Sequence, residues 1–256
     1  ETTLLGFVCK QGEVRISTDP NYPPFSSLNA TSNEYEGFDI DVAKLIAEKL
    51  GVTIKWETPS WDALTAGNWA DRWDVSVGSM AQTESRTAVI DFSEPYYYAL
   101  AYVAVPTTST ATSLADLAGK EFCIGSGTLY ESWLKGEFAN QSLVEVSAPP
   151  PAGITVTSEE TDNLCIEKLA AGRTWDGFVQ GKEFIDNAIA GGAAIKFLDN
   201  KWLTAEKISV ALDKGGKDTA SMLAAINEII AAAHADGTLS ALSKASLSGA
   251  DVTVKQ

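Results

Sequence analysis

The chain has 256 residues, enough for one or two domains that each have a hydrophobic core. Hydrophobic residues make up 45% of it and charged residues 21%, which are ordinary values for a globular protein. Because 34 acidic residues outnumber 19 lysines and arginines, the net charge is −15, which argues against nucleic acid or an anionic membrane surface as a partner.

No stretch of the sequence is predicted to cross a membrane or to export the protein. The longest apolar run, 99–105, is far shorter than the roughly 18 residues of a membrane-spanning helix. Residues 1–12 lack the basic start and the long apolar core of a signal peptide. We therefore expect either a cytoplasmic protein or the mature form of an exported one.

The spacings of the three cysteines, Cys9, Cys123 and Cys165, are not typical of a metal site. Because His234 is the one histidine, we predict neither a site of His and Cys ligands nor a Cys–His catalytic pair. We also predict no metal and no cofactor. In an oxidising compartment Cys123 and Cys165 would form a disulfide, and the alternative is a pair of buried thiols.

Strands and helices alternate through the first part of the chain. The predicted elements, in order, are a strand at 13–17, a helix at 39–50, a strand at 52–57, a helix at 61–69 and a strand at 73–77. Asp39 is the expected N-cap of the first helix, and Gly51 is expected to end it. This order is typical of a parallel sheet, which binds ligands at the carboxyl ends of its strands.

A strand at 99–106 and a polar connector at 107–113 lead into a second set of elements. These are a short helix at 114–119, a strand at 122–125, a helix at 129–134, a strand at 143–146, a loop at 148–153, a helix at 161–171, a strand at 175–179, a helix at 182–190, a strand at 195–198, a strand at 208–212 that returns to the first sheet, and helices at 221–234 and 239–243. We therefore predict an α/β protein of two lobes with a cleft between them. Lobe 1 comprises 1–105 and 205–256, and lobe 2 comprises 106–204.

The turn after the third predicted strand has the residue types of an anion-binding segment. Two small residues, Gly78 and Ser79, precede Thr83, the expected N-cap of a helix whose hydroxyl and free N–H groups face an anion. Arg86 at position N3 excludes a capping box and adds a planar set of donors that matches a carboxylate. Residues 126–128, Ser-Gly-Thr, repeat this combination before a second helix.

A proline-rich loop, residues 18–25, follows the first predicted strand and presents Asp19, Tyr22 and Phe25. Its three prolines fix an extended backbone at low entropic cost. We expect Phe25 to pack in the core. We expect Tyr22 to be partly exposed, where an aromatic ring serves as a contact surface.

Motifs over the whole chain include DPNYPPF at 19–25, EGFDID at 36–41 and IDFSEPYY at 90–97. With these motifs and the segments 73–86 and 126–128, the chain resembles the periplasmic-type (type II) solute-binding proteins of amino-acid ABC importers, family 3. The resemblance implies a Venus-flytrap fold, in which two lobes, each a mixed, mainly parallel sheet flanked by helices, close on a small ligand. It further implies a periplasmic or extracellular monomer that docks on an ABC transporter permease, with a membrane-associated lipoprotein as one form of the precursor.

The resemblance also implies which residues bind the ligand. Arg86 would pair with its carboxylate, and Thr128 would donate a hydrogen bond to the same group from the other lobe. Tyr22 and Trp61 would enclose the body of the ligand between their rings. Asp19 would lie at the floor of the side-chain pocket.

Other positions of the expected site depart from the family pattern. Gly78 and Ser79 would offer backbone groups to the amine or carboxylate of the ligand, but Ala81 stands where the family commonly has Thr or Ser. Gln180 and Gly181 stand where amino-acid binders usually have an Asp that pairs with the α-ammonium. A buried ammonium without a carboxylate is unfavourable by several kcal/mol.

Two explanations for the missing carboxylate are left open. Either Asp19, Glu183 or another acid replaces it, or the ligand is a carboxylate without an ordinary α-amine. A second function class is an enzyme, since a few relatives of this fold are dehydratases, and Glu183 is the candidate general acid. We expect Glu183 to be a solvated helix residue and the protein not to be an enzyme. A sensor domain is a third class, but the sequence has no output segment.

Overall fold

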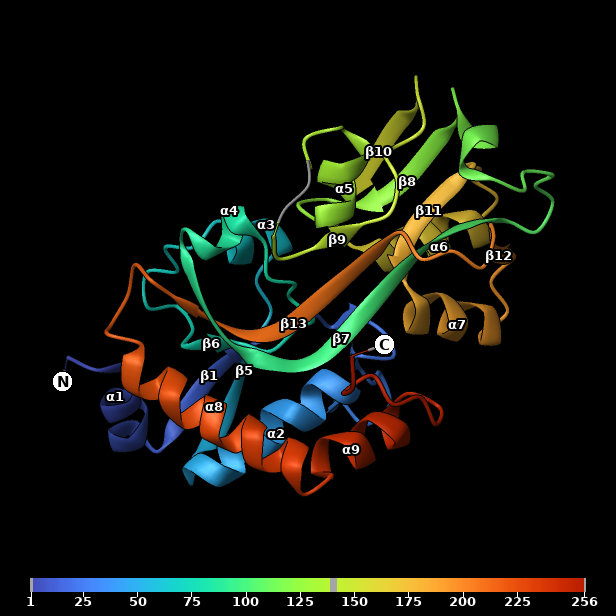
Figure 1. Cartoon of the computed structure of the whole chain (residues 1–256). Helices are drawn as coiled ribbons and strands as arrows, with labels where there is room; N and C mark the ends of the chain where they lie inside the picture. The colour runs from blue at the N-terminus through green and yellow to red at the C-terminus, as the bar shows by residue number, and fades with distance from the viewer. Residues whose placement is uncertain (1, 139–141, 256) are drawn as a thin grey trace. The chain divides into compact units, whose positions relative to one another are not determined.

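The computed structural model describes residues 2–138 and 142–255 (Figure 1). The chain forms two compact units, unit 1 from Glu1–Tyr98 with Lys207–Gln256 and unit 2 from Ala99–Glu206. The chain leaves unit 1 within strand β7 (Ile90–Pro106) and returns to it within strand β13 (Thr204–Asp213). The predicted lobe boundaries, at 105 and 204, fall inside the same two strands.

The sheet of unit 1 has the order β5-β1-β6-β13. Strand β1 (Glu13–Ser17) pairs in parallel with β5 (Thr53–Glu57) and with β6 (Val75–Ser76), so that Ile16 lies between Trp56 and Val75. Strand β13 is antiparallel to β6. The predicted parallel strand–helix–strand arrangement is therefore confirmed, and the segment that follows β6 begins at the carboxyl edge of this sheet.

Helices α2 (Phe38–Leu50), α8 (Ala220–Ala235) and α9 (Thr238–Ser246) pack against one another in unit 1 (Figure 1). Ile40, Ala43, Ile46 and Ala47 of α2 are buried, and Gly51 ends the helix as predicted, in a left-handed conformation with φ of 71°. Helix α1 (Leu4–Gln11) packs on β1 and α8. This helix was not predicted.

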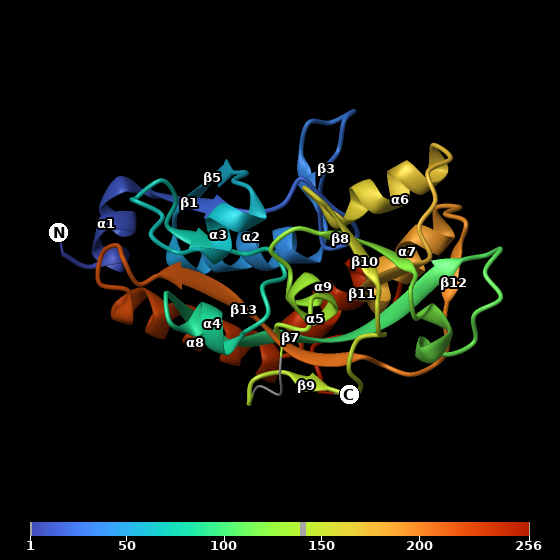
Figure 2. The ribbon, with the colours of Figure 1, turned by 90° about the horizontal axis from the view of Figure 1, so that it is seen from above.

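A small antiparallel sheet of β2 (Asn21–Tyr22), β3 (Ser26–Leu28) and β4 (Tyr35–Glu36) replaces the predicted loop. It contacts α2 through β3 and β4 (Figure 2). The strands are too short, at two or three residues, to show an alternating pattern.

The N-cap of α2 is Gly37 and not Asp39, which corrects the prediction. Gly37 has φ of 121°, and a Cβ there would lie 2.4 Å from the carbonyl oxygen of Phe25, so glycine alone allows this close approach. The N–H groups of Phe38 and Asp39 donate to the carbonyls of Pro24 and Phe25. The helix therefore starts earlier than predicted because its first N–H groups bind the preceding loop.

Two other predictions for unit 1 differ from the structure. Strand β7 is continuous over 17 residues, from Ile90, where a strand was predicted only at 99–106. Helix α3 (Trp61–Thr65) ends four residues early, because the carboxylate of Asp213 accepts hydrogen bonds from the N–H groups of Asn68 and Trp69, at 2.9 Å and 2.6 Å, and these are no longer available to a helix. Helix α4 (Glu84–Thr87) begins as predicted after its N-cap, Thr83.

Unit 2 has a sheet in the order β10-β8-β11-β7. The strands that lie wholly within unit 2 are β8 (Glu121–Gly125), β9 (Glu145–Val146), β10 (Thr155–Glu159), β11 (Gly177–Gly181) and β12 (Ile195–Phe197). Strand β8 pairs in parallel with β10 and β11, and β11 is antiparallel to β7. Strand β10 was not predicted, because TVTSE is polar and gives no clear apolar alternation.

The helical elements of unit 2 are η1 (Leu114–Leu117), α5 (Leu129–Leu134), α6 (Asp162–Ala170) and α7 (Lys182–Ala190). The bounds of α5 and α7 are those predicted. Among the residues that the structure describes, no helix is long and apolar enough to span a membrane.

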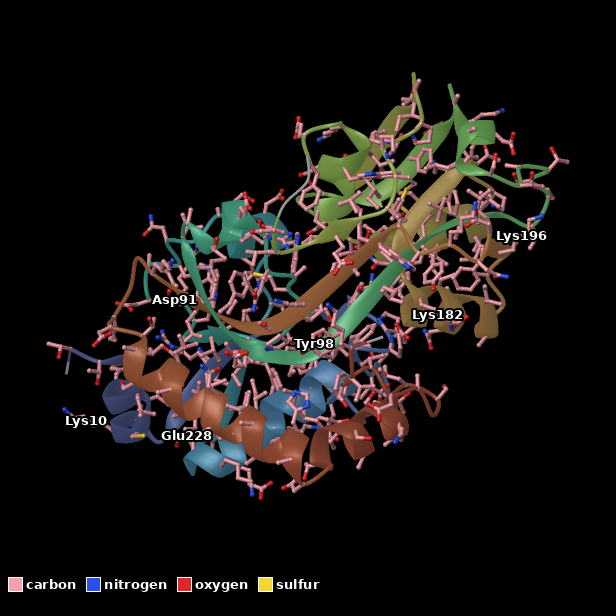
Figure 3. All side chains as sticks on the ribbon, in the orientation of Figure 1. Lys10, Asp91, Tyr98, Lys182, Lys196 and Glu228 are labelled. Atoms are coloured by element: carbon pink, nitrogen blue, oxygen red, sulfur yellow. A yellow bond between two sulfur atoms is a disulfide. The ribbon has the colours of Figure 1, made fainter. Side chains whose placement is uncertain are left out.

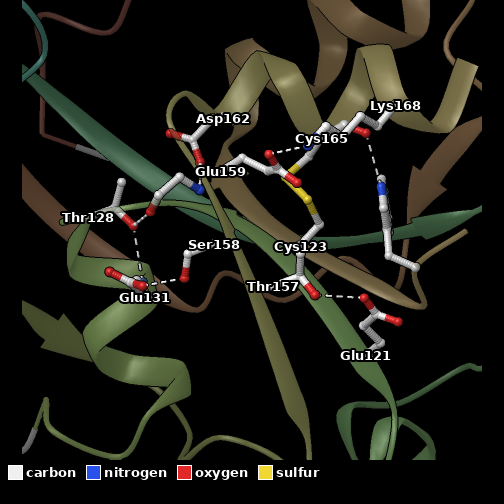
Figure 4. Close-up of a disulfide and its surroundings, with 12 residues drawn as sticks. Glu121, Cys123, Thr128, Glu131, Thr157, Ser158, Glu159, Asp162, Cys165 and Lys168 are labelled. Carbon is white, nitrogen blue, oxygen red and sulfur yellow. Dashed lines mark hydrogen bonds and ion pairs between the residues drawn. A yellow bond between two sulfur atoms is a disulfide. The ribbon is translucent and has the colours of Figure 1, made fainter. Parts of the chain in front are cut away.

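Cys123 on β8 and Cys165 on α6 form a disulfide in unit 2, which decides between the two predicted alternatives (Figure 4). Ion pairing between Glu159 and Lys168 joins β10 to the same helix. Cys9 on α1 is exposed and unbonded. The disulfide closes a loop with a sequence separation of 42 residues, so it restricts the unfolded chain strongly.

Replacing both Cys123 and Cys165 with alanine should lower the free energy of unfolding by about 4 kcal/mol, because a loop of this length gains that much entropy when released. Urea denaturation of the oxidised protein and of the double variant would measure the difference. The control is Cys9→Ser, which should change stability by less than about 0.5 kcal/mol. Equal stabilities of the wild type and the double variant would contradict this role for the disulfide.

Candidate ligand-binding site

Arg86 and Trp61 lie together in unit 1. The hydroxyl oxygen of Thr83 accepts a hydrogen bond from the Arg86 N–H at 3.2 Å, which fixes the start of α4. The Arg86 side chain is buried, with its Cζ 5.3 Å from the centre of the Trp61 ring, and its Nη1 donates to the carbonyl of Ala81 at 3.1 Å. A guanidinium has five N–H donors in one plane, and this fixed geometry matches that of a carboxylate.

Ser79 follows β6 and adopts a left-handed backbone, with φ of 54°. We expected its backbone N–H to serve a ligand, but it donates to the hydroxyl of Tyr96 at 3.2 Å. The Ser79 hydroxyl donates to Asp39 at 2.8 Å and accepts from Tyr97 at 2.8 Å. The neighbouring Gly78 packs against the start of the 18–25 loop, since a Cβ there would lie 4.0 Å from the backbone nitrogen of Asp19.

Asp39 lies inside this region and does not have the helix-capping role predicted for it. Its carboxylate is fully buried and accepts hydrogen bonds from the hydroxyls of Tyr96, at 2.7 Å, and Ser79. Burial raises the pKa of Asp39 to about 7 against the opposing effect of these bonds. The pKa values of Tyr96 and Tyr97 are raised well above their ordinary value by burial and by the charge of Asp39. The signal in the sequence was EGFDID, whose Asp39 we had read as a cap.

Tyr22 belongs to a stack of aromatic rings in unit 1. The centre of its ring lies 5.6 Å from that of Phe25, which lies 5.2 Å from that of Tyr97. Phe25 is buried as predicted, and Tyr22 is half-buried. Asp19 accepts a hydrogen bond from the backbone of Asn21 at 2.7 Å, which tightens the turn before β2. The loop thus holds Tyr22 against the stacked rings of Phe25 and Tyr97.

Thr128 is the N-cap of α5 in unit 2, where its hydroxyl oxygen accepts from the N–H of Glu131 at 3.1 Å (Figure 4). The same hydroxyl donates to the carbonyl of Gly125 at 2.9 Å. Glu131 also accepts from the N–H of Gly127 and from Ser158, and these bonds, with that from Lys135, lower its pKa although burial acts to raise it. In this structure the Thr128 hydroxyl binds backbone groups of its own turn. Its hydrogen bond to a ligand stays a prediction.

Gln180 and Gly181 form the end of β11, which starts and ends two positions later than the strand predicted there. Gln180 is buried, and its side-chain oxygen accepts from the N–H of Gly181 at 2.7 Å. A Cβ on Gly181 would meet no atom within 4 Å, and its φ of −55° suits any residue. A longer side chain therefore has room at this position.

Glu183 lies in the first turn of α7, beside Lys182, which is labelled in Figure 3. Glu183 is half-buried, although a fully solvated residue was expected. Burial raises the pKa of Glu183 above the ordinary value. Lys182 pairs with Asp186 at 2.5 Å one turn further along. Within residues 2–138 and 142–255, no group of His, Cys, Asp and Glu side chains is arranged to hold a metal ion.

Residues 14–248 match the family described as "Bacterial extracellular solute-binding proteins, family 3". The chain is 31% identical to the L-cystine-binding protein TcyJ of Escherichia coli (strain K12), covering 98% of this chain and 88% of that protein. It is 28% identical to the lysine/arginine/ornithine-binding periplasmic protein of the same strain, covering 90% and 86%. Among solved structures it is similar to an ancestral arginine-binding protein bound to arginine, with a TM-score of 0.78 and 26% identity over 91% of this chain and 97% of that one.

The pH dependence of stability should report the ionisation of Asp39. Because folding raises its pKa from the ordinary 3.8 to about 7, the folded protein holds a proton that the unfolded chain has lost between these values. This contribution to stability is fully present below the unfolded pKa and is lost as the pH rises through about 7. Relative to Asp39→Asn, the wild type should lose on the order of 4 kcal/mol between pH 4 and 8.

Urea denaturation at several pH values would measure this difference. Asp41→Asn is the matched control, since Asp41 lies on the same helix and is bound by the hydroxyl of Ser246 at 2.6 Å. It should keep the pH dependence of the wild type. A constant difference between the wild type and Asp39→Asn across this range would show that Asp39 keeps an ordinary pKa in the folded protein.

Proposed function

Since the chain belongs to the bacterial extracellular solute-binding proteins of family 3, we propose that it captures an amino acid or a related small carboxylate for an ABC importer. Its fold is that of the type II periplasmic binding proteins. The observation that carries the proposal is the buried guanidinium of Arg86 against the ring of Trp61, just beyond the carboxyl edge of the unit 1 sheet. Arg86 can form charge-assisted hydrogen bonds with a carboxylate, and the Trp61 ring provides an apolar surface beside it.

The relatives support binding over catalysis and an amino acid over other solutes. Those relatives are named as binding proteins for L-cystine and for lysine, arginine and ornithine. A further structural neighbour, at a TM-score of 0.79 and 25% identity over 96% of this chain and 100% of that one, is the ancestral amino acid-binding protein AncCDT-1, a precursor of cyclohexadienyl dehydratase. That neighbour leaves dehydration as the second candidate function, with the raised pKa of Glu183 as the observation in its favour.

An extracytoplasmic location is part of the proposal. The disulfide between Cys123 and Cys165 supports it, because such bonds persist in oxidising compartments. The permease partner and the monomeric state belong to the same proposal. The hinge closure that the family resemblance implies stays a prediction.

The ligand class depends on position 181. We propose that Gly181 leaves the α-ammonium of a ligand without its usual carboxylate partner. The open space at Gly181 supports this, because no neighbouring side chain fills the place of the missing carboxylate. An α-amino acid then needs another acid, such as Asp19 or Glu183, and an amine-free carboxylate needs none.

A thermal-shift screen with the twenty amino acids and a set of amine-free carboxylates tests the binding proposal. A ligand at about 100 times its dissociation constant should add about 2.7 kcal/mol, which raises the melting temperature by about 5–10 °C. Arg86→Lys keeps the charge but loses the planar pair of donors, so it should weaken binding by about 10- to 100-fold. Arg72→Lys is the matched control, since Arg72 also stacks on a tryptophan, 4.6 Å from the Trp73 ring, but is exposed.

Absence of any shift from a carboxylate ligand would overturn the proposed function. A shift that survives in Arg86→Lys would instead remove Arg86 from the binding site. Turnover of a cyclic carboxylate, followed by absorbance and abolished by Glu183→Gln, would favour the enzyme.

Gly181→Asp should strengthen the binding of α-amino acids by at least about tenfold, since it supplies a carboxylate for the ammonium in a place with room for it. The isosteric Gly181→Asn is the control, because it has the same size without the charge. Calorimetric titrations of both variants with the amino acids found in the screen would measure the effect. Equal affinities in the two variants would show that position 181 does not face the ammonium.

A further inference from the structure

A buried hydrogen-bond network joins three elements of unit 1. We call its four members, Asp39 on α2, Ser79 after β6, and Tyr96 and Tyr97 on β7, the Asp39 network. Asp39 accepts from Tyr96 at 2.7 Å and from Ser79 at 2.8 Å. Tyr97 donates to the Ser79 hydroxyl, and the Ser79 N–H donates to the Tyr96 hydroxyl.

The directions of these bonds suit an ionised Asp39. Both hydroxyls that touch the carboxylate donate to it, and each accepts a second bond, from Tyr97 or from the Ser79 backbone. The two tyrosines stay neutral donors because their pKa values are raised well above the ordinary one. A protonated Asp39 would have to donate to Ser79 or Tyr96, so one hydroxyl would have to reverse its direction.

The backbone of Ser79 depends on this network. A left-handed conformation, here with φ of 54°, is unfavourable for a residue other than glycine. Two hydrogen bonds offset this cost. The backbone N–H of Ser79 donates to Tyr96, and its side-chain hydroxyl donates to Asp39. Loss of either bond would favour another backbone conformation at the turn that includes Gly78.

The network also supports the aromatic stack. Tyr97, whose hydroxyl is bound to Ser79, stacks on Phe25, and Phe25 stacks on Tyr22. The backbone N–H of Asp39 donates to the carbonyl of Phe25 at 2.8 Å. Asp39 thus holds the loop that presents Tyr22 in two ways. Its backbone N–H binds the loop directly, and its carboxylate acts on the loop through Ser79 and Tyr97.

We propose that Asp39 is a positioning residue: its ionised carboxylate holds Ser79 in the left-handed conformation, and gain of one proton by the network releases it. The consequence for affinity rests on the proposed function and on the predicted contacts of Gly78, Ser79 and Tyr22 with the ligand. Asp39 itself is fully buried and so acts through these neighbours.

The exchange of this proton falls in the neutral range. The titratable groups that face Asp39 are Tyr96 and Tyr97 from β7 and Asp19 from the loop after β1, and the charge of Asp19 adds to the effect of burial. With the pKa of Asp39 at about 7 and binding confined to the ionised form, the dissociation constant should be about tenfold higher at pH 6 than at pH 8.

The first experiment needs no ligand. NMR titration of protein labelled at the Asp carboxyl carbon and at backbone nitrogen would follow Asp39 and the Ser79 amide from pH 5 to 9. Both signals should change with one midpoint near the pKa of about 7, and the Ser79 change should vanish in Asp39→Asn. The control Asp41→Asn should behave as the wild type. A Ser79 amide that does not follow the titration of Asp39 would overturn the proposal.

The second experiment measures affinity for L-arginine and L-cystine by calorimetry at pH 6 and pH 8. Ser79→Gly adopts the left-handed backbone without the hydroxyl bond to Asp39, so it should bind equally at both pH values. Ser79→Ala lacks the hydroxyl but keeps the backbone cost, so it should bind weakly at both. This pair keeps the proposal testable if Asp39→Asn does not fold.

The outcomes separate the two proposals. A tenfold pH effect in the wild type that is absent from Ser79→Gly supports the positioning role. The same pH effect in Ser79→Gly would overturn it. If neither probe nor any amino acid or amine-free carboxylate of the screen binds while Ser79 still follows Asp39, the proposed function fails and the control of Ser79 by Asp39 stands.

Discussion

The burial of the Asp39 carboxylate is the constraint on which much of unit 1 depends. A carboxylate removed from water is costly unless it accepts hydrogen bonds, so its partners cannot be moved independently. Those partners come from β7 and from the turn after β6, while Asp39 lies on α2. One side chain therefore sets the relative positions of a helix, a turn and a strand that are distant in the sequence.

The elements that could be predicted from sequence are those whose pattern is local and long enough to repeat. Helices α5 and α7 have clear starts after Thr128 and Gly181, and their bounds are as predicted. The small sheet β2-β3-β4 and strand β10 could not be predicted, because their residues are few or polar and their pairing partners lie elsewhere in the chain.

The same distinction explains which parts of the candidate site could be predicted. Thr83 and Thr128 cap helices through neighbours three residues away, and both caps follow from local sequence. Asp39 has the local pattern of a cap as well, but the close approach of Gly37 to Phe25 moves the helix start and turns the carboxylate inward. Contacts across 40 residues or more, such as Ser79 with Asp39, leave no periodic signal in a single sequence.

The cysteines of the chain also give it a practical property. With Cys123 and Cys165 joined in unit 2, Cys9 is the exposed thiol of α1, a helix that packs on β1 and α8 of unit 1. A thiol-reactive dye would therefore attach to one unit of the unmodified protein while the bonded pair stays intact. The wild-type chain can therefore be labelled at a defined position of unit 1 without replacing a cysteine.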